Sequence, residues 1–214
     1  NKDLTKGYQD AQFFSLYVTI KQTDLIYPEL DSLRGTFADR SVNEHFLILV
    51  LVLKAVSRCL GLGTLEFLRR SQEPVEDTDF FKFIDNTIGW GSSKPTDCFE
   101  MFEVFAKHLS EVYSDSLQYL DTILEDPTET PKFKRPLLRF STFLLPLLDA
   151  WRKLDGMPKS ELMFVIIDDA DYLNEMQTKI LNTYISTRQA SVFFKVASEV
   201  FQYKSYNTLD GRRI

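Results

Sequence analysis

Apolar residues form short continuous runs near both ends of the chain and recur at helical spacing between them. The run Phe13–Ile20 is rich in aromatic and β-branched side chains, which is typical of a β-strand. The runs Leu162–Ile167 and Ser191–Ala197 are apolar almost without interruption, which predicts strands of a parallel sheet buried on both faces. Between these two, Asn174–Ile185 is amphipathic and predicts a helix. The C-terminal part therefore predicts a strand–helix–strand unit with parallel strands.

The middle of the chain, residues 40–155, predicts helices. Ser41 and Glu44 have the spacing of a capping box, which predicts a helix that begins at Ser41 and ends near Leu60. The preceding segment, Lys21–Asp39, contains the breakers proline and glycine and predicts a loop.

Further helices are predicted in the rest of this segment. Asp79–Ile88 predicts a short helix, and Thr96 or Asp97 would cap a long one. The long helix carries a phenylalanine stripe, Phe99, Phe102 and Phe105, which we expect in the core. A last helix, Leu137–Leu154, would be kinked or split at Pro146.

Strand-like runs near both ends and helical spacing between them predict an α/β fold in three segments. Residues 1–39 would hold the N-terminal part of the α/β core, including the strand at 13–20. Residues 156–214 would hold the rest of that core. Residues 40–155 would form a large all-helical insertion between two strands of one parallel sheet.

Composition fits a globular protein and excludes other classes. The 214 residues are 44% hydrophobic and 26% charged, which argues against a disordered chain, a collagen-like repeat or a coiled-coil rod. The longest apolar run, Phe46–Val56, is too short for a bilayer, which needs about 20 residues. The N-terminus shows no secretory signal. We expect a cytoplasmic protein, with Cys59 and Cys98 as thiols rather than a disulfide.

Charge and histidine content narrow the function. The formal net charge is −6, whereas a nucleic-acid binder usually carries a basic excess, so the charge gives nucleic-acid binding no support. His45 and His108 are the two histidines, which argues against a histidine-based metal cage or catalytic triad. We expect both histidines to be packed or surface residues of helices.

Directly after the strand Leu162–Ile167 come three acids: Asp168, Asp169 and Asp171. In open α/β sheets, ligands bind at the carboxyl ends of the strands. Carboxylates crowded there repel each other unless a cation, a basic partner or solvent offsets the charge. The alternative is a solvated turn in which Asp171 caps the next helix. A D-x-D phosphatase site is a weaker alternative, because the residues after Asp171 do not suit it.

The acidic run resembles the Walker B motif of P-loop ATPases, a hydrophobic strand followed by Asp and a second acid. This resemblance implies that Asp168 helps to hold Mg²⁺ and that Asp169 is the general base for the attacking water. Ser198, after the next strand, falls where the family has a polar sensor of the γ-phosphate, although it could simply end its strand. The stretch from Asp168 to Ser198 is similar to bacterial AAA+ ATPases of origin-recognition type and to STAND-type signalling ATPases.

The resemblance covers about 50 residues and departs from the family in two ways. Most AAA+ enzymes have Glu where this chain has Asp169. The phosphate loop G-x-x-x-x-G-K-[ST] is missing, because its nearest match, Gly89–Thr96, lacks Gly before Lys and contains Pro95. In the family this loop follows a first strand, which we expect before Asn1. Counted in that way, the helical insertion lies between the second and third strands of a partial P-loop sheet.

The resemblance implies Mg²⁺-dependent binding and hydrolysis of ATP within a longer AAA+ or STAND-like ATPase, which couples nucleotide state to conformational change or assembly. A protein partner or a second copy of the chain would be the binding partner. The alternative is a degenerate ATPase fold that acts as a scaffold through its helical insertion. A DNA-associated initiator or loader would need a basic domain outside this stretch. Arg212 and Arg213, in an irregular polar tail, could face a neighbouring subunit. Arg188 precedes its strand, and we expect it to be a solvated or interface arginine.

Overall fold

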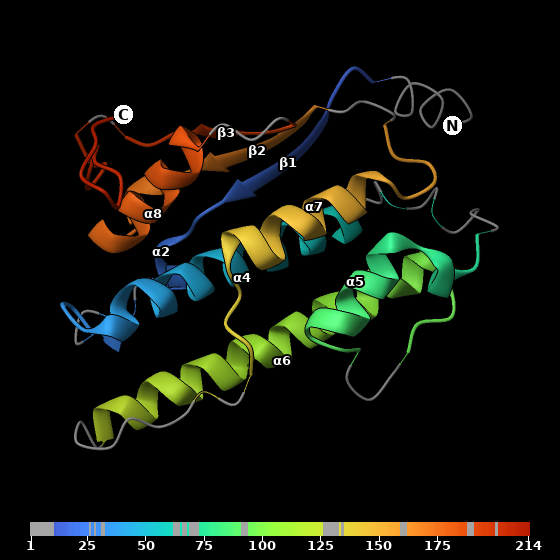
Figure 1. Ribbon diagram of the computed structural model, residues 1–214, viewed down its shortest axis with the longest axis horizontal. Coiled ribbons are helices and arrows are strands. Elements are labelled where there is room, and N and C mark those ends of the chain that lie inside the picture. The colour runs from blue at the N-terminus through green and yellow to red at the C-terminus, as the bar shows by residue number, and fades with distance from the viewer. Residues whose placement is uncertain are drawn as a thin grey trace.

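The computed structural model has an α/β fold in which the described helices lie on one side of a small parallel sheet (Figure 1). The structure describes residues 11–25, 27, 29–30, 33–61, 65, 68, 73–90, 94–125, 133, 135–158, 162–187, 191–199 and 201–214. Its elements are β1 (Phe14–Thr19), α2 (Gln22–Leu25), α4 (Phe37–Gly61), η2 (Val75–Asp77), α5 (Asp79–Thr87), α6 (Cys98–Glu125), η3 (Phe140–Leu144), α7 (Leu145–Arg152), β2 (Met163–Asp168), η4 (Ala170–Tyr172), α8 (Glu175–Ser186) and β3 (Val192–Val196).

The three predicted strands are confirmed and form one parallel sheet in the order β1-β2-β3. Leu16 pairs with Val165, and Val165 pairs with Phe194, so these side chains lie on the same face of the sheet. The helices cover that face, and its residues in β1 and β2 are buried. The helical segment lies between β1 and β2 in sequence, as predicted. The sequence also predicts a strand before Asn1, which would make β1 and β2 the second and third strands. That earlier strand stays a prediction.

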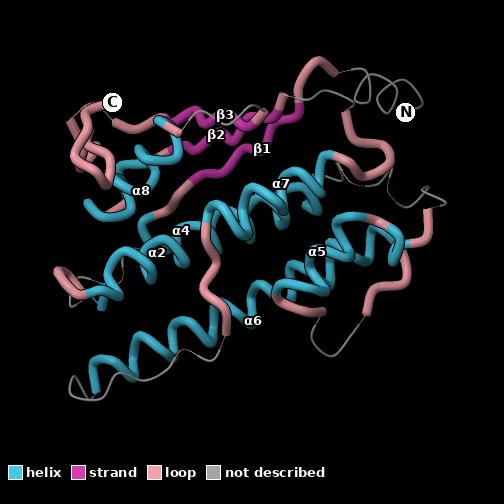
Figure 2. The backbone as a smooth tube through the Cα atoms, viewed as in Figure 1, coloured by secondary structure: helices cyan, strands magenta, loops and turns pink. Residues whose placement is uncertain are grey.

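The helices form two layers below the sheet, as the tube in Figure 2 also shows. Helix α4 packs on β1 and also contacts α6 and α8, while α5 packs on α7. A cluster of aromatic rings joins the layers: Trp151 lies 5.0 Å from Phe102 and 6.1 Å from Phe14, measured between ring centroids. The predicted phenylalanine stripe of α6 is buried in this core, as expected. Burial of these rings helps to hold the helices against the sheet.

Helix α4 begins at Phe37, four residues before the predicted start, so the capping box at Ser41 is wrong. The carboxylate of Glu44 accepts hydrogen bonds from the amide of Phe140 at 3.1 Å and from the hydroxyl of Tyr184 at 3.0 Å. Glu44 therefore connects α4 to η3 and α8 instead of capping its own helix. The predicted loop before α4 is also partly helical, because it contains α2.

The later helices follow the prediction with local differences. Asp97 caps α6, since its carboxylate accepts hydrogen bonds from the amides of Phe99 and Glu100 at 2.8 Å each. The predicted helix from Leu137 instead begins with the π-helical turn η3. Pro146 then lies in the first turn of α7, where its missing N–H costs least.

Strand β3 was expected to be buried on both faces, and the structure corrects this. Its residues alternate between half-buried and exposed, and Phe193 is 42% exposed. The reason is its position at the edge of the sheet, together with an upper sheet face that no described helix covers. Ser15, Tyr17, Phe164 and Lys195 lie on that same face.

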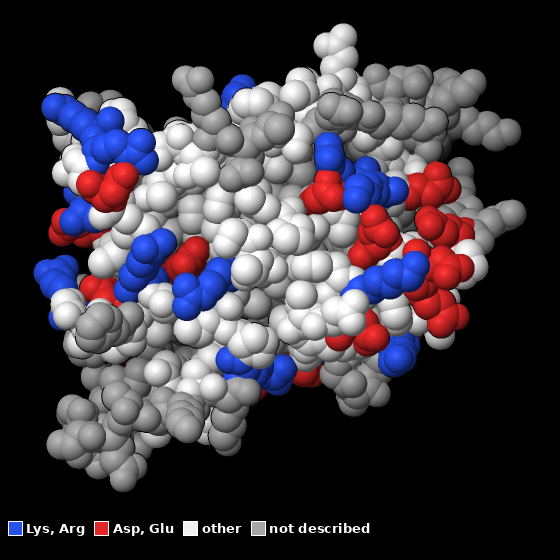
Figure 3. Space-filling view, viewed as in Figure 1, with Lys and Arg blue, Asp and Glu red and all other residues white. Residues whose placement is uncertain are grey.

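Charged side chains are unevenly spread over the face seen in Figure 3. Acidic side chains gather at the end of the molecule where α5 lies, and basic ones are more frequent at the opposite end, near the C-terminal tail. Both predicted packed histidines are buried, His45 in α4 and His108 in α6. Among the described residues, no helix is both long and apolar enough to cross a bilayer.

Candidate functional site

The predicted site lies at the carboxyl ends of the neighbouring strands β2 and β3. Backbone hydrogen bonds fix this edge: the amide of Ile20 donates to the carbonyl of Asp168 at 3.0 Å, and the amide of Ala170 donates to the carbonyl of Ala197 at 3.0 Å. Because Ser198 follows Ala197, these bonds bring the acidic turn and Ser198 next to each other.

Asp168 is the last residue of β2 and is half-buried. One of its carboxylate oxygens, Oδ1, accepts a hydrogen bond from the amide of Asp169 at 3.1 Å. The other, Oδ2, accepts a hydrogen bond from the hydroxyl of Tyr17 in β1. Donors on both oxygens fix the plane of the carboxylate.

Asp169 has a left-handed backbone, with φ 57° and ψ 40°. Few residues other than glycine adopt this conformation, although Asp does so more often than most. The chain turns there from the strand into η4, and the carbonyl of Asp169 accepts a hydrogen bond from the amide of Tyr172 at 3.3 Å. No described residue donates a hydrogen bond to the carboxylate of Asp169.

Asp171 does not cap the following helix, so that prediction is wrong. Asn174 caps α8, through a capping box in which Gln177 is the reciprocal partner. Asn174 lies directly before the first helical turn, and Asp171 is three residues too early, within η4. Asp171 instead accepts a long hydrogen bond, 3.4 Å, from the amide of Glu199. It thus joins η4 to the segment that follows β3.

The three acids do not form a metal cage. Across the described part of the chain, no group of three or more His, Cys, Asp or Glu side chains could hold a metal ion. Asp168 alone offers an oriented oxygen ligand at the strand end. Mg²⁺ is commonly bound by one or two carboxylates together with substrate phosphates and water, so a single acid suits it when a phosphate is present.

Ser198 is half-buried, and its hydroxyl donates to the carbonyl of Glu199 at 3.4 Å. Ser198 lies beside the acidic turn, and its role as a sensor stays a prediction. Arg188, which was expected to be a solvated or interface arginine, lies outside the described residues, as does the centre of the Gly89–Thr96 string.

The C-terminal tail contains no helix or strand, as its sequence predicts, and it packs on α8. The buried amide of Asn182 donates to the carbonyls of Ser205 and Asn207, at 2.8 Å and 2.9 Å, and its oxygen accepts from the hydroxyl of Tyr203 at 2.7 Å. The amide of Leu209 donates to the hydroxyl of Thr183 at 2.9 Å. Together these bonds hold the tail against α8.

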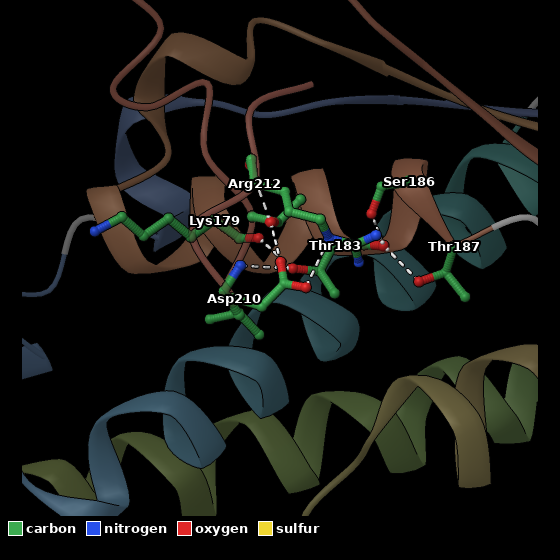
Figure 4. Close-up of polar contacts among 8 residues, drawn as sticks. Lys179, Thr183, Ser186, Thr187, Asp210 and Arg212 are labelled. Carbon is green, nitrogen blue, oxygen red and sulfur yellow. Dashed lines mark hydrogen bonds and ion pairs between the residues drawn. The ribbon is translucent and has the colours of Figure 1, made fainter.

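The tail also positions the two arginines. Arg212 donates to Asp210 at 2.7 Å, and Figure 4 shows this pair beside Lys179 and Thr183 of α8. Arg213 is exposed and forms an isolated antiparallel bridge with Asn207 through the backbone. The bridge gives Arg213 a defined place at the surface, and its contact with a neighbouring subunit stays a prediction.

A separate cavity of about 190 Å³ opens beside the N-terminal ends of α4 and α8. Its walls carry both charges, with Asp39 and Glu175 against Arg34 and Lys179. None of the predicted site residues lines it, so the cavity and the acidic turn are separate features.

Comparison with known proteins identifies the family. The chain matches a family model described as ORC-CDC6-like over residues 1–214, its full length here. Comparisons with curated proteins and with solved structures give no match. The chain therefore belongs to the ORC-CDC6-like family and is a relative of origin-recognition-type AAA+ ATPases, as the sequence predicted. Membership in this family implies nucleotide binding in general, usually together with Mg²⁺.

Proposed function

We propose that this member of the ORC-CDC6-like family contributes the acidic half of an ATP-hydrolysing site, with Asp168 on the magnesium side and Asp169 as general base. The chain would act within a longer AAA+ ATPase that couples ATP turnover to conformational change or assembly. Residues 1–214 contain no G-x-x-x-x-G-K-[ST] segment, so the proposal requires a phosphate loop elsewhere in the polypeptide.

The observation that carries the proposal is the orientation of Asp168. Its carboxylate ends the central strand of the sheet, and donors from Tyr17 and Asp169 hold both of its oxygens. An acid at this edge of a parallel sheet lies where nucleotides bind in α/β folds. When bound, Mg²⁺ would neutralise charge on the phosphates. Asp168 would hold its side of the metal through one carboxylate oxygen.

Asp169 suits the role of base for a different reason. Its carboxylate accepts no hydrogen bond from any described residue, whereas that of Asp168 accepts two. The chain leaves the strand through a left-handed turn at Asp169, and in this proposal the two neighbouring acids serve different partners. Ser198, beside this turn, would contact the phosphate that Asp169 helps to cleave.

The outer edge of β3 supports the idea of a larger sheet. Among the described strands, β3 pairs with β2 alone, and Phe193 on it is partly exposed. A further parallel strand added at this edge would bring its own carboxyl end next to Ser198. That is where a phosphate loop would have to lie in order to share a nucleotide with Asp168.

The test is ATP hydrolysis by the full-length polypeptide with single substitutions. Asp168→Asn should lower turnover at least tenfold, and Asp169→Asn should lower turnover to a similar degree while ATP binding is retained. Asp121→Asn, an exposed acid of α6, is the matched control and should change neither. Turnover equal to wild type in both site variants would refute the proposal and favour the scaffold function of the helical segment.

A further inference from the structure

One residue beside the acidic turn has no role in the family resemblance: Tyr17 of β1. Its hydroxyl donates to Oδ2 of Asp168, 151 positions later in the chain. The guanidinium carbon of Arg58, near the end of α4, lies 4.6 Å from the centroid of the Tyr17 ring. The three side chains thus form a chain of contacts from α4, across β1, to the end of β2.

The register of the sheet makes the contact between Tyr17 and Asp168 possible. Tyr17 pairs with Ile166, and Thr19 pairs with Asp168, so Tyr17 lies diagonally across from Asp168 on the same face. Tyr17 is well anchored, because its neighbours Leu16 and Val18 are buried under the helices. A tyrosine side chain has few rotatable bonds, and its hydroxyl therefore reaches Asp168 from a fixed direction.

Removal of a group that holds a metal ligand in place typically weakens metal binding by about 10- to 100-fold. Tyr17 occupies one oxygen of Asp168 and leaves the remaining lone pairs at a defined angle. The cationic Arg58 over the ring face is a cation–π contact, which resists rotation of the ring. Because Arg58 belongs to α4, the position of the ring depends on the helical segment as well as on the sheet.

We propose that Tyr17 is a positioning residue that orients Asp168 toward Mg²⁺, and that Arg58 holds the Tyr17 ring from α4. This inference rests on the proposed function, because it gives Asp168 the magnesium side of the site. It adds a path by which a partner that moves the end of α4 changes the affinity of the site for the metal.

The experiment measures metal binding directly. Mn²⁺ is titrated into the full-length protein with a non-hydrolysable ATP analogue, and bound metal is followed by electron paramagnetic resonance. Tyr17→Phe removes the hydroxyl and keeps the ring. We expect it to raise the half-saturating Mn²⁺ concentration about tenfold or more. Turnover at saturating Mg²⁺ should recover most of the wild-type value, which a general loss of structure would not allow.

A double variant shows whether Tyr17 acts through Asp168, and a variant of Arg58 tests the contact with the ring. In the Asp168→Asn background, Tyr17→Phe should have no further effect on Mn²⁺ binding. Arg58→Gln should weaken binding in the same direction by a smaller factor, about two- to fivefold. Tyr206→Phe, in the exposed part of the tail, is the matched control and should change nothing.

The outcomes separate the two proposals. If Asp168→Asn weakens Mn²⁺ binding and Tyr17→Phe does not, the positioning role of Tyr17 is wrong and the proposed function stands. If Asp168→Asn itself leaves Mn²⁺ binding unchanged, both proposals fall. An effect of Tyr17→Phe that persists undiminished in the Asp168→Asn background would also overturn the positioning role, because Tyr17 would then act on another group.

Discussion

The two faces of the sheet differ in chemistry although they come from the same strands. Phe14, Leu16 and Val18 of β1 point to the helices and are at most 4% exposed. Ser15 and Tyr17, between them in sequence, point to the opposite face, where no described helix lies. The buried face is aliphatic and aromatic, while the open face carries Tyr17 and the carboxylate of Asp168.

This difference shows how one sheet can separate stability from chemistry. Adjacent residues of a strand face opposite sides, so a substitution at one position affects the core and the next affects the site. Variants on the helix-covered face should therefore change mainly the free energy of unfolding. Variants on the open face should change mainly what the site binds.

The largest expected effect is on the covered face. Leu16→Ala leaves a cavity against α4 and should lower the free energy of unfolding by about 3 kcal/mol. Ser15→Ala, one position earlier and exposed, should change it by less than about 0.5 kcal/mol. Urea denaturation of the purified protein measures both. Equal losses in the two variants would break the comparison, because both faces would then be part of the core.

Acid should also destabilise the covered side, through His45 of α4. Burial lowers the pKa of His45 to about 4, and its ring accepts a hydrogen bond from the amide of Leu138 at 3.0 Å and contacts the hydroxyl of Ser116 at 2.9 Å. In the unfolded chain its pKa would be about 6.5. Between these values the unfolded state binds the proton more readily, so the free energy of unfolding falls as pH drops from about 6.5 to 4, by up to ~3 kcal/mol.

The control for this effect is a chain without the buried imidazole. His45→Gln should show a smaller loss of stability between pH 7 and pH 4.5 than the wild type does, whatever its stability at pH 7. The same dependence on pH in both proteins would assign the acid sensitivity to other groups.

A smaller effect is expected where α8 joins the helices. Tyr184→Phe removes the hydrogen bond to Glu44 and keeps the ring stacked on Phe140, with centroids 3.9 Å apart. Since Glu44 retains its bond from the amide of Phe140, the loss should be about 1 kcal/mol. Thermal unfolding, with Tyr206→Phe as the exposed control, measures it. No change in Tm would show that Glu44 gains nothing from Tyr184.

The smallest effect should come from the open face. Phe193 of β3 is 42% exposed and contacts Phe164 at 5.5 Å between centroids. Phe193→Thr keeps a residue that favours strands and should cost less than about 1 kcal/mol in the free energy of unfolding. If Phe193→Thr lowered the free energy of unfolding as much as Leu16→Ala does, the open face of the sheet would have to be covered in the folded protein.

The strands could be predicted because continuous apolar runs carry their own signal, and the same signal located Asp168 at a strand end. Features that depend on contacts between distant residues could not. Glu44 has the spacing of a capping box, but its bonds go to η3 and α8. The contact between Tyr17 and Asp168 depends on the register between β1 and β2, which no local pattern contains. Strand β3 reads as fully buried because its apolar run does not reveal its place at an edge.

The left-handed turn at Asp169 restricts which amino acids evolution can place there. Glycine accepts such a backbone without strain, and Asn and Asp accept it more readily than longer side chains do. Glu, the usual second acid of AAA+ enzymes, would gain reach at the cost of a less favourable backbone. In homologues that keep this turn, we therefore expect Asp, Asn or Gly at this position more often than Glu. Selection for the shape of the turn would then limit how fast such a site can evolve to hydrolyse ATP.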